Sequence, residues 1–209
     1  MKTILFLIAY LVMAVSFTAC TTDNHEFPKF ELDGADLQDL EDYSVYQTIL
    51  EDYSLSNMLV KQETSIILPL SKDLQLFFNS NTLKMMEDGL FQKFMEENTS
   101  VSFLDQNKIN FHKEVKLISN GEYSFIFGND DHKAWEIMQS RYDVPDGYHT
   151  VLNKIAYSAD RNQAFVGGQD YYFLMVDGKR QTKKMGWVNY MEKENNEWIS
   201  KGQASYFFD

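Results

Sequence analysis

The last third of the chain alternates polar and apolar residues in short runs, and this pattern constrains the fold more than any other feature. Strands are predicted over residues 150–158, 163–167, 170–176, 186–192 and 197–207. The connections are short and rich in turn formers, such as Asp177-Gly178 and Asn195-Asn196. Consecutive strands joined by short turns predict an antiparallel β-meander.

The first half of the chain is predicted to be mainly helical. Tyr46, Ile49 and Leu50 recur at helical spacing behind Ser44, a candidate N-cap. Further helices are expected to begin at Ser71, at Asn81 or Thr82, and at Asp130 or Asp131. A strand is expected over residues 63–68, and short strands or extended loops over 101–127. Helices first and strands last predict an α+β fold, with N-terminal helices packed on a C-terminal antiparallel meander.

The first twenty residues are expected to be a secretion signal that does not belong to the folded domain. Lys2 precedes an apolar run over residues 4–17, which is too short to cross a bilayer. The run closes with Phe17-Thr18-Ala19-Cys20, and Cys20 is the chain's single cysteine. This ending resembles the lipobox of bacterial lipoproteins, which implies a signal peptide over residues 1–19 and lipid attachment at Cys20. The alternative is a short uncleaved membrane anchor that ends in cysteine.

Residues 20–42 are predicted to form an acidic, flexible tether, which leaves residues 43–209 as a single α+β domain. The acids behind Cys20 resemble the surface-export signals of lipoproteins from Bacteroidetes-like bacteria, although an ordinary solvated leash has the same composition. The expected location is therefore the cell envelope, lipid-anchored at the outer membrane, with the periplasmic and the cell-surface orientation both open.

The charge balance restricts the partners. The formal net charge is −12, and it becomes −13 when cleavage removes Lys2. Such an acidic protein repels nucleic-acid phosphates, so nucleic-acid binding is excluded. The same charge predicts repulsion from an anionic membrane surface, so membrane contact is expected to come from the lipid. A single cysteine also rules out an internal disulfide.

The C-terminal half is similar to a group of bacterial secreted proteins and lipoproteins to which no activity is assigned. The similarity covers about residues 132–200 and rests on the order of several short motifs: Trp135, Tyr142, Asp146-Gly147-Tyr148, Ile155-Ala156-Tyr157-Ser158, Asn162 to Gly167, Gly186 to Lys193 and Trp198-Ile199. Residues 168–184 depart from that pattern as an extra hairpin-like segment. The resemblance implies export and an α+β fold. The final strands also resemble cone-shaped domains of the nuclear-transport-factor-like kind, by analogy of fold alone.

No catalytic or metal-binding motif is present in the sequence. His25, His112, His132 and His149 stand at no metal-ligand spacing, and the elbow of serine hydrolases is absent. Asp130 and Asp131 fit a helix cap better than a cation site. Gly167-Gly168 is interpreted as a bulge or bend. Glu114 and Glu122 are candidates for a hidden acid pair, but solvated surface acids are the simpler interpretation. No catalytic residue, metal or cofactor is therefore predicted.

The aromatic residues of the predicted sheet are the remaining candidates for a binding site. Exposed, they could stack on sugar rings or hold a peptide, and buried, they form the core face. Tyr172 and Trp187 are chosen as candidate ligand contacts. The favoured function is a non-catalytic binding or scaffold domain on a lipid anchor, with an unidentified protein or glycan ligand. The alternatives are a hydrolase of envelope material or glycan, and an immunity or inhibitor lipoprotein.

Overall fold

The computed structural model describes residues 27–55, 57–66, 80–142 and 144–207, and these residues form an α+β fold. The predicted signal peptide, Cys20 and the helix expected at Ser71 lie outside the described residues. The elements are α2 (Leu40–Glu51), β1 (Asn57–Lys61), α3 (Ser80–Met85), α4 (Leu90–Glu97), β2 (Glu114–Ile118), α5 (Asn120–Phe127), α6 (Asp131–Tyr142), β3 (His149–Leu152), β4 (Ala156–Tyr157), β5 (Gln163–Val176), β6 (Lys179–Glu194) and β7 (Glu197–Phe207).

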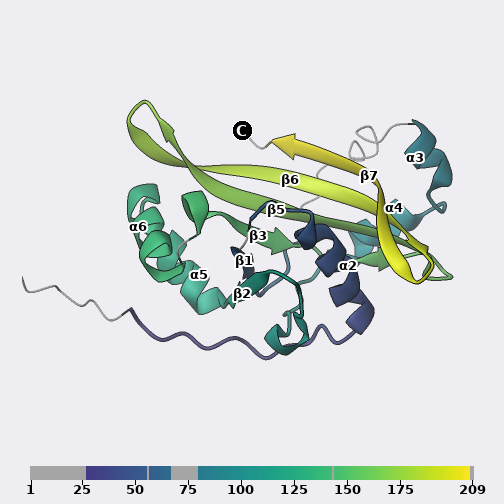
Figure 1. Ribbon diagram of the computed structural model, residues 1–209, viewed down its shortest axis with the longest axis horizontal. Helices are drawn as coiled ribbons and strands as arrows, with labels where there is room; N and C mark the ends of the chain where they lie inside the picture. Colours follow the sequence, from purple (N-terminus) through teal and green to yellow (C-terminus); the bar gives the residue numbers. More distant parts are fainter. Residues whose placement is uncertain (1–26, 56, 67–79, 143, 208–209) are drawn as a thin grey trace, which may run out of the picture.

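The described strands form one seven-stranded sheet with the order β2-β1-β3-β5-β6-β7, and β4 pairs with β5 (Figure 1). Strands β5, β6 and β7 are antiparallel neighbours, as the alternation predicts. The turn residues Asp177, Gly178, Asn195 and Asn196 all have positive φ angles, which suits two-residue hairpin turns. The strand predicted over residues 197–207 and both of these turns are therefore confirmed.

The predicted C-terminal meander is only part of the sheet, because β1 and β2, from the first half of the chain, join it. β1 pairs in parallel with β2 and with β3, so the sheet is mixed. The strand expected over residues 63–68 is not found over residues 63–66, where Glu63 makes only an isolated bridge with Phe103, and residues 67 and 68 lie outside the described residues. The strand in this part of the chain is β1. Met58, Leu59 and Val60 are all buried, so β1 is covered on both faces. A strand buried on both faces lacks the alternation that reveals a half-exposed one.

Several boundaries in the helical half also differ from prediction. α2 begins at Leu40 behind Asp39, whose carboxylate accepts from the Glu41 amide at 3.0 Å, so Ser44 lies inside the helix. Gly89, with φ of 87°, separates α3 from α4 where one helix was expected. Residues 123–127, for which a short strand or an extended loop was expected, belong to α5. That helix is capped by Ser119, which accepts from the Glu122 amide.

The cap predicted at the start of α6 is confirmed. One carboxylate oxygen of Asp130 accepts from the amides of His132 and Lys133, both at 3.0 Å. These are the first amides of the helix, which have no partner within it. The carboxylate therefore has a structural role.

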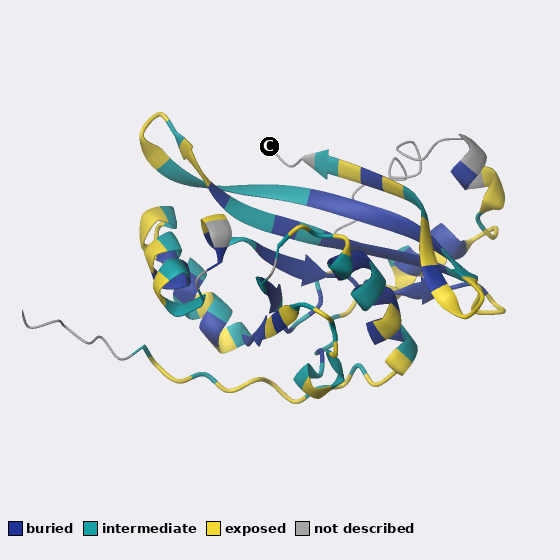
Figure 2. Ribbon diagram, viewed as in Figure 1, coloured by how far each residue is buried: buried dark blue, intermediate teal, exposed yellow. Residues whose placement is uncertain are grey.

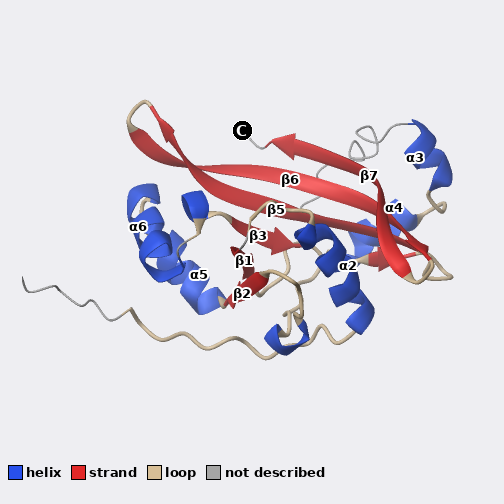
Figure 3. Cartoon of the chain, viewed as in Figure 1, coloured by secondary structure: helices blue, strands red, loops and turns tan. Residues whose placement is uncertain are grey.

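Helices cover both faces of the sheet (Figure 3), rather than forming one N-terminal layer on a C-terminal one. On the first face, α2 shares a hydrophobic cluster with Val166, Trp187 and Met191. On the second face, α4 packs against Phe165 and Tyr190, and α5 and α6 pack around Phe173. Odd and even positions of β5 thus serve different helices, as strand geometry requires. Burial is deepest along β5 and β6 between these helices (Figure 2).

Residues 27–39 run along the body of the protein as an extended segment (Figure 1). The Gln62 side chain holds this segment by donating to the Asp33 carbonyl and accepting from the Asp33 amide, both at 2.8 Å. The Asp36 carboxylate accepts from the Phe103 amide at 2.6 Å. The described part of the predicted flexible tether is therefore held against the domain, and helix α2 begins before residue 42.

Gly167 and Gly168 do not form a bulge, because β5 pairs with β6 in continuous register through both. They provide room instead. A Cβ atom at Gly168 would lie 2.4 Å from Cζ2 of Trp187, and one at Gly167 would lie 3.1 Å from Cζ of Phe94. The absence of a side chain at these two positions lets an aromatic ring lie directly on each face of the strand.

Gly168→Ala is expected to destabilise the protein by about 1–3 kcal/mol, because the new methyl group must displace the buried indole of Trp187. Urea unfolding followed by tryptophan fluorescence measures the change. Gly34→Ala is the matched control, because a Cβ there would meet no atom within 4 Å. Equal stabilities of the two variants would show that the contact between Gly168 and Trp187 does not constrain the sheet.

Candidate functional site

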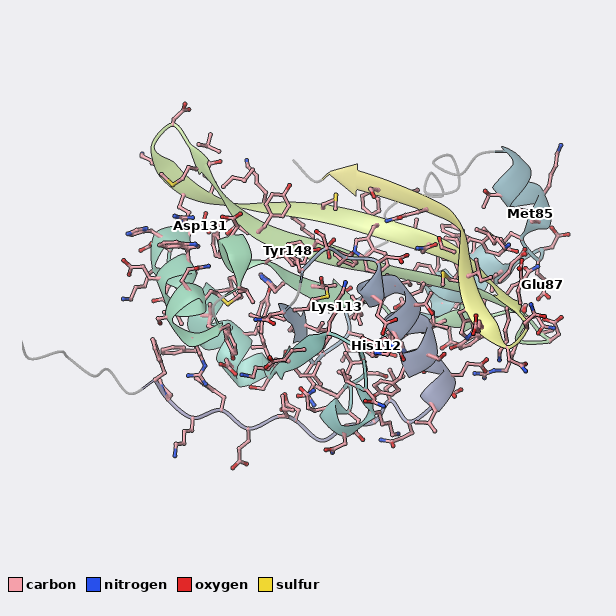
Figure 4. All side chains as sticks on the ribbon, viewed as in Figure 1. Met85, Glu87, His112, Lys113, Asp131 and Tyr148 are labelled. Carbon is pink, nitrogen blue, oxygen red and sulfur yellow. The ribbon has the colours of Figure 1, made fainter. Side chains whose placement is uncertain are left out.

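A pocket of about 230 Å³ lies on the first face of the sheet, at the C-terminal end of α2. The strands β5, β6 and β7 form its floor, and the residues after η3 (Pro145–Gly147) form one side. Lys113 holds the end of α2 in place by donating to the carbonyl of Glu51 at 2.6 Å. Lys113 and Tyr148 are labelled at this place in Figure 4. The lining residues are Ile49, Asp52, Tyr53, Tyr148, Asp170, Met185, Trp187, Asn189 and Gln203.

Asp170 is the buried charged group of this pocket, with 0% of its surface exposed. Tyr53 donates a hydrogen bond to one carboxylate oxygen at 3.0 Å, and Thr150 donates to the other at 2.8 Å. Among the described residues, no cation forms an ion pair with Asp170. Burial raises the pKa of the Asp170 carboxyl, and the surrounding hydrogen-bond donors oppose that rise.

Two further polar groups near Asp170 lack a hydrogen bond of ordinary geometry. These are the Tyr148 hydroxyl and the Trp187 indole N–H, and both atoms are buried. Both side chains lie close enough to Asp170 to favour its ionised form. The rings of Tyr53 and Tyr148 are 6.0 Å apart and inclined by 57°. An indole N–H can only donate, so a group that satisfies it must bring an acceptor. Buried donors without partners are rare and call for an explanation.

The two predicted ligand contacts have different surroundings. Trp187 is 1% exposed, belongs to the core cluster around α2, and also lines the pocket. Tyr172 is half-buried and does not line the pocket. Register places both on the same face as Asp170, because Asp170 lies opposite Met185 between the pairs Gly168–Trp187 and Tyr172–Lys183. Asp170 was not among the residues predicted from the sequence, although an acid between Gly168 and Tyr172 in an apolar strand is a visible signal.

The acid pair suggested by Glu114 and Glu122 is not supported. Glu114 is exposed on β2. Glu122 is buried on α5, where its carboxylate forms an ion pair with Arg141 and accepts from the Tyr142 hydroxyl. Because those two partners occupy the same oxygen of Glu122 and it sits in a packed cluster, this carboxylate serves the fold.

His149 is a core residue in the described structure. Its ring stacks on Tyr171 at 5.0 Å, and its two nitrogens lie 3.2 Å from the Gly147 carbonyl and 3.3 Å from the Tyr123 hydroxyl. Burial lowers the pKa of His149 to about 4, and the Gly147 carbonyl opposes this shift. No group of three or more His, Cys, Asp or Glu residues that could hold a metal ion occurs in the part of the chain that the structure describes.

Comparisons with known proteins add no assignment. No family model matches the chain, and no curated protein matches it. A solved structure from Xanthomonas campestris, named for a calcium/calmodulin dependent protein kinase II association domain, is 10% identical and covers 87% of this chain and 97% of its own. Its TM-score of 0.27 is too low to support an argument about fold or function. Within the described residues, no helix has both the length and the apolar character needed to span a membrane.

His149 and Asp42 are expected to give opposite pH dependences of stability. The pKa of His149 falls from 6.5 to about 4 on folding, so its neutral form stabilises the protein above pH 6.5. That contribution, about 3 kcal/mol, is lost as the pH falls towards 4. Burial raises the pKa of Asp42 from 3.8 to about 6, although Tyr157 donates to it at 2.8 Å. The folded state therefore holds a proton on Asp42 between these values, and acidification favours folding there.

Single substitutions distinguish the contributions of His149 and Asp42 to the pH dependence of stability. His149→Gln should be more stable at pH 4.5, relative to its own stability at pH 7, than the unmodified protein is. Asp42→Asn should show a larger loss on acidification than the unmodified protein. Urea unfolding at both pH values measures these differences. A His149→Gln variant with an unchanged pH profile would contradict the burial of a neutral imidazole.

Proposed function

We propose that this protein is a lipid-anchored, extracytoplasmic binding protein whose ligand site is the pocket around Asp170. The observation that carries the proposal is the buried indole N–H of Trp187 in the wall of that pocket, which lies close to the Asp170 carboxylate but forms no hydrogen bond of ordinary geometry. In this proposal α2 and the antiparallel strands β5, β6 and β7 form the binding unit. A lipid anchor at Cys20 is supported by the sequence of the leader alone.

The chemistry of the pocket favours a small ligand rich in hydroxyl groups, such as the end of a glycan. A sugar hydroxyl accepts from an indole N–H and can also donate to a phenol or carboxylate oxygen. Trp187 and Tyr148 provide polar groups without a hydrogen bond of ordinary geometry, and Tyr53 and Tyr148 provide aromatic surface. Ile49 and Met185 add apolar walls for the faces of a ring. A peptide carbonyl would satisfy Trp187 alone and would leave Tyr148 and Asp170 without a new partner.

A hydrolase is the second candidate, because two carboxyl groups line the same pocket. Asp170 is buried with a raised pKa, while Asp52 is exposed near the end of α2. Different surroundings for two carboxyl groups are the arrangement that glycosidases use for an acid and a base or nucleophile. One experiment distinguishes the binding protein from the hydrolase. Asp52→Asn should leave ligand binding intact in a binding protein and should abolish turnover in a hydrolase.

Trp187→Phe is expected to weaken sugar binding about tenfold, because it removes the indole N–H and keeps a ring in the core. Saturation-transfer NMR against a panel of monosaccharides, with their amino and N-acetyl forms, measures the effect. Trp198→Phe is the matched control, since Trp198 is also buried in the α2 cluster but does not line the pocket. Binding that Trp187→Phe leaves unchanged, or binding to no sugar in the panel, would contradict the glycan proposal.

Cys20→Ala is expected to abolish lipid attachment, so that the protein leaves the membrane fraction or retains its leader. Intact-mass spectrometry and fractionation of cells measure these results. Thr21→Ala, one residue further along, is the control and should be lipidated normally. Membrane association of Cys20→Ala with no change in mass would point to the uncleaved anchor instead.

A further inference from the structure

The tip of the β5–β6 hairpin is a basic, apolar projection on an acidic protein. Residues 174–184, here called the arm, extend beyond α6 in Figure 1. Leu174 and Met175 are 42% and 59% exposed. The arm contains four basic residues and one acid in a chain whose net charge is −12. These residues are Lys179, Arg180, Lys183, Lys184 and Asp177.

Contacts with α6 hold the arm in place. The Asp131 carboxylate accepts from the Thr182 amide at 3.0 Å and from its hydroxyl at 2.6 Å. The guanidinium of Arg180 lies over the Trp135 ring, 3.5 Å from its centroid. Asp131 is labelled directly below the arm in Figure 4. The neighbouring Asp130 is occupied by the first amides of α6. The nearest acids of α6 thus support the arm and the helix, and the tip of the arm remains exposed (Figure 2).

The arm lies at the end of the molecule from which the chain leads back to Cys20. Arg141 of α6 donates to the Pro28 carbonyl at 3.4 Å, and Phe30 packs on Phe125 of α5 with ring centroids 5.4 Å apart. Residues 28–30 therefore lie against the same pair of helices, one of which supports the arm. Figure 1 shows both features at one end of the long axis, with α3 at the other end.

We propose that the arm rests on the membrane surface and binds the phosphate groups of anionic lipids. This inference rests on the lipid anchor of the proposed function. An anchor at Cys20 would bring this end of the protein to the bilayer. Lys and Arg side chains are attracted to anionic headgroups over about one Debye length, roughly 8 Å in physiological salt. Leu174 shares one face of the hairpin with Lys179 and Lys183 and is placed to enter the boundary between headgroups and acyl chains.

The experiment uses the polypeptide from residue 21 onward, produced without lipid, which contains every residue of the three hydrophobic clusters. We expect it to cosediment with vesicles of phosphatidylcholine and phosphatidylglycerol, and to be released by salt. Vesicles of phosphatidylcholine alone should bind little. The double substitution Lys179→Gln with Lys183→Gln should lower the partition coefficient about 25-fold, because each basic residue contributes roughly a fivefold factor.

Matched variants control for charge and apolarity. Lys84→Gln with Lys201→Gln changes the net charge equally, outside the arm, on α3 and β7. Leu174→Ser should weaken vesicle binding severalfold, while Ile199→Ser, at an exposed site on β7, should not. Circular dichroism establishes that each variant folds.

Equal losses in arm and control variants, equal binding to neutral vesicles, or equally tight binding to polyglutamate would each overturn the proposal. Lipidation is measured separately on the full chain. A failure of the arm to bind vesicles is therefore distinguishable from a failure of the anchor.

Discussion

The continuous antiparallel pairing of β5 with β6 is the constraint on which the rest of the structure depends. It runs from the pair Gln163–Glu192 to the pair Val176–Lys179 without a shift in register. This register sends Asp170 and Trp187 to the face that α2 covers, and Phe165 and Phe173 to the face that α4, α5 and α6 cover. A slip by one residue would exchange the two faces and bury the wrong set. The register of β5 with β6 therefore determines both the pocket and the hydrophobic packing on the two faces of the sheet.

The sequence predicts the elements whose structure is encoded locally. The turns at Asp177-Gly178 and Asn195-Asn196 need positive φ angles, which these residue types accept. The ends of the flanking strands could therefore be predicted from these turn residues. The cap of α6 at Asp130 is local in the same way. The parallel strand β1 could not be recognised, because its partners lie more than fifty residues away in the sequence, whereas β2 falls within residues 101–127, where short strands or extended loops were expected. Residues 123–127 have a strand-like composition, and packing of α5 against α6 and Phe173 overrides it.

Only part of the candidate site could be predicted from the sequence, because Asp170, like β1, depends on partners that are distant in the sequence. Aromatic content directed attention to Trp187 and Tyr172, but Asp170 acquires its properties from long-range partners. Tyr53 donates to it from a position 117 residues earlier in the chain. Desolvation of that carboxyl depends on the whole first face of the sheet, and no local motif records it. A buried carboxyl group such as that of Asp170 is recognised from its burial and its hydrogen bonds in the folded structure, since the sequence shows only an acid in a strand.

The local charge of the arm and the net charge of the whole chain lead to different expectations for binding to anionic lipid. A net charge of −12 predicts repulsion from anionic lipid if the protein acts as a point charge. Screening limits each charge to about 8 Å in physiological salt, which is much shorter than β6. An anionic surface facing the arm therefore interacts with Lys179, Lys183 and their neighbours, and scarcely with the acids around α2. Orientation then matters more than total charge. An anchor that presents the basic end would turn an acidic protein into one whose membrane-facing side is attracted to the bilayer.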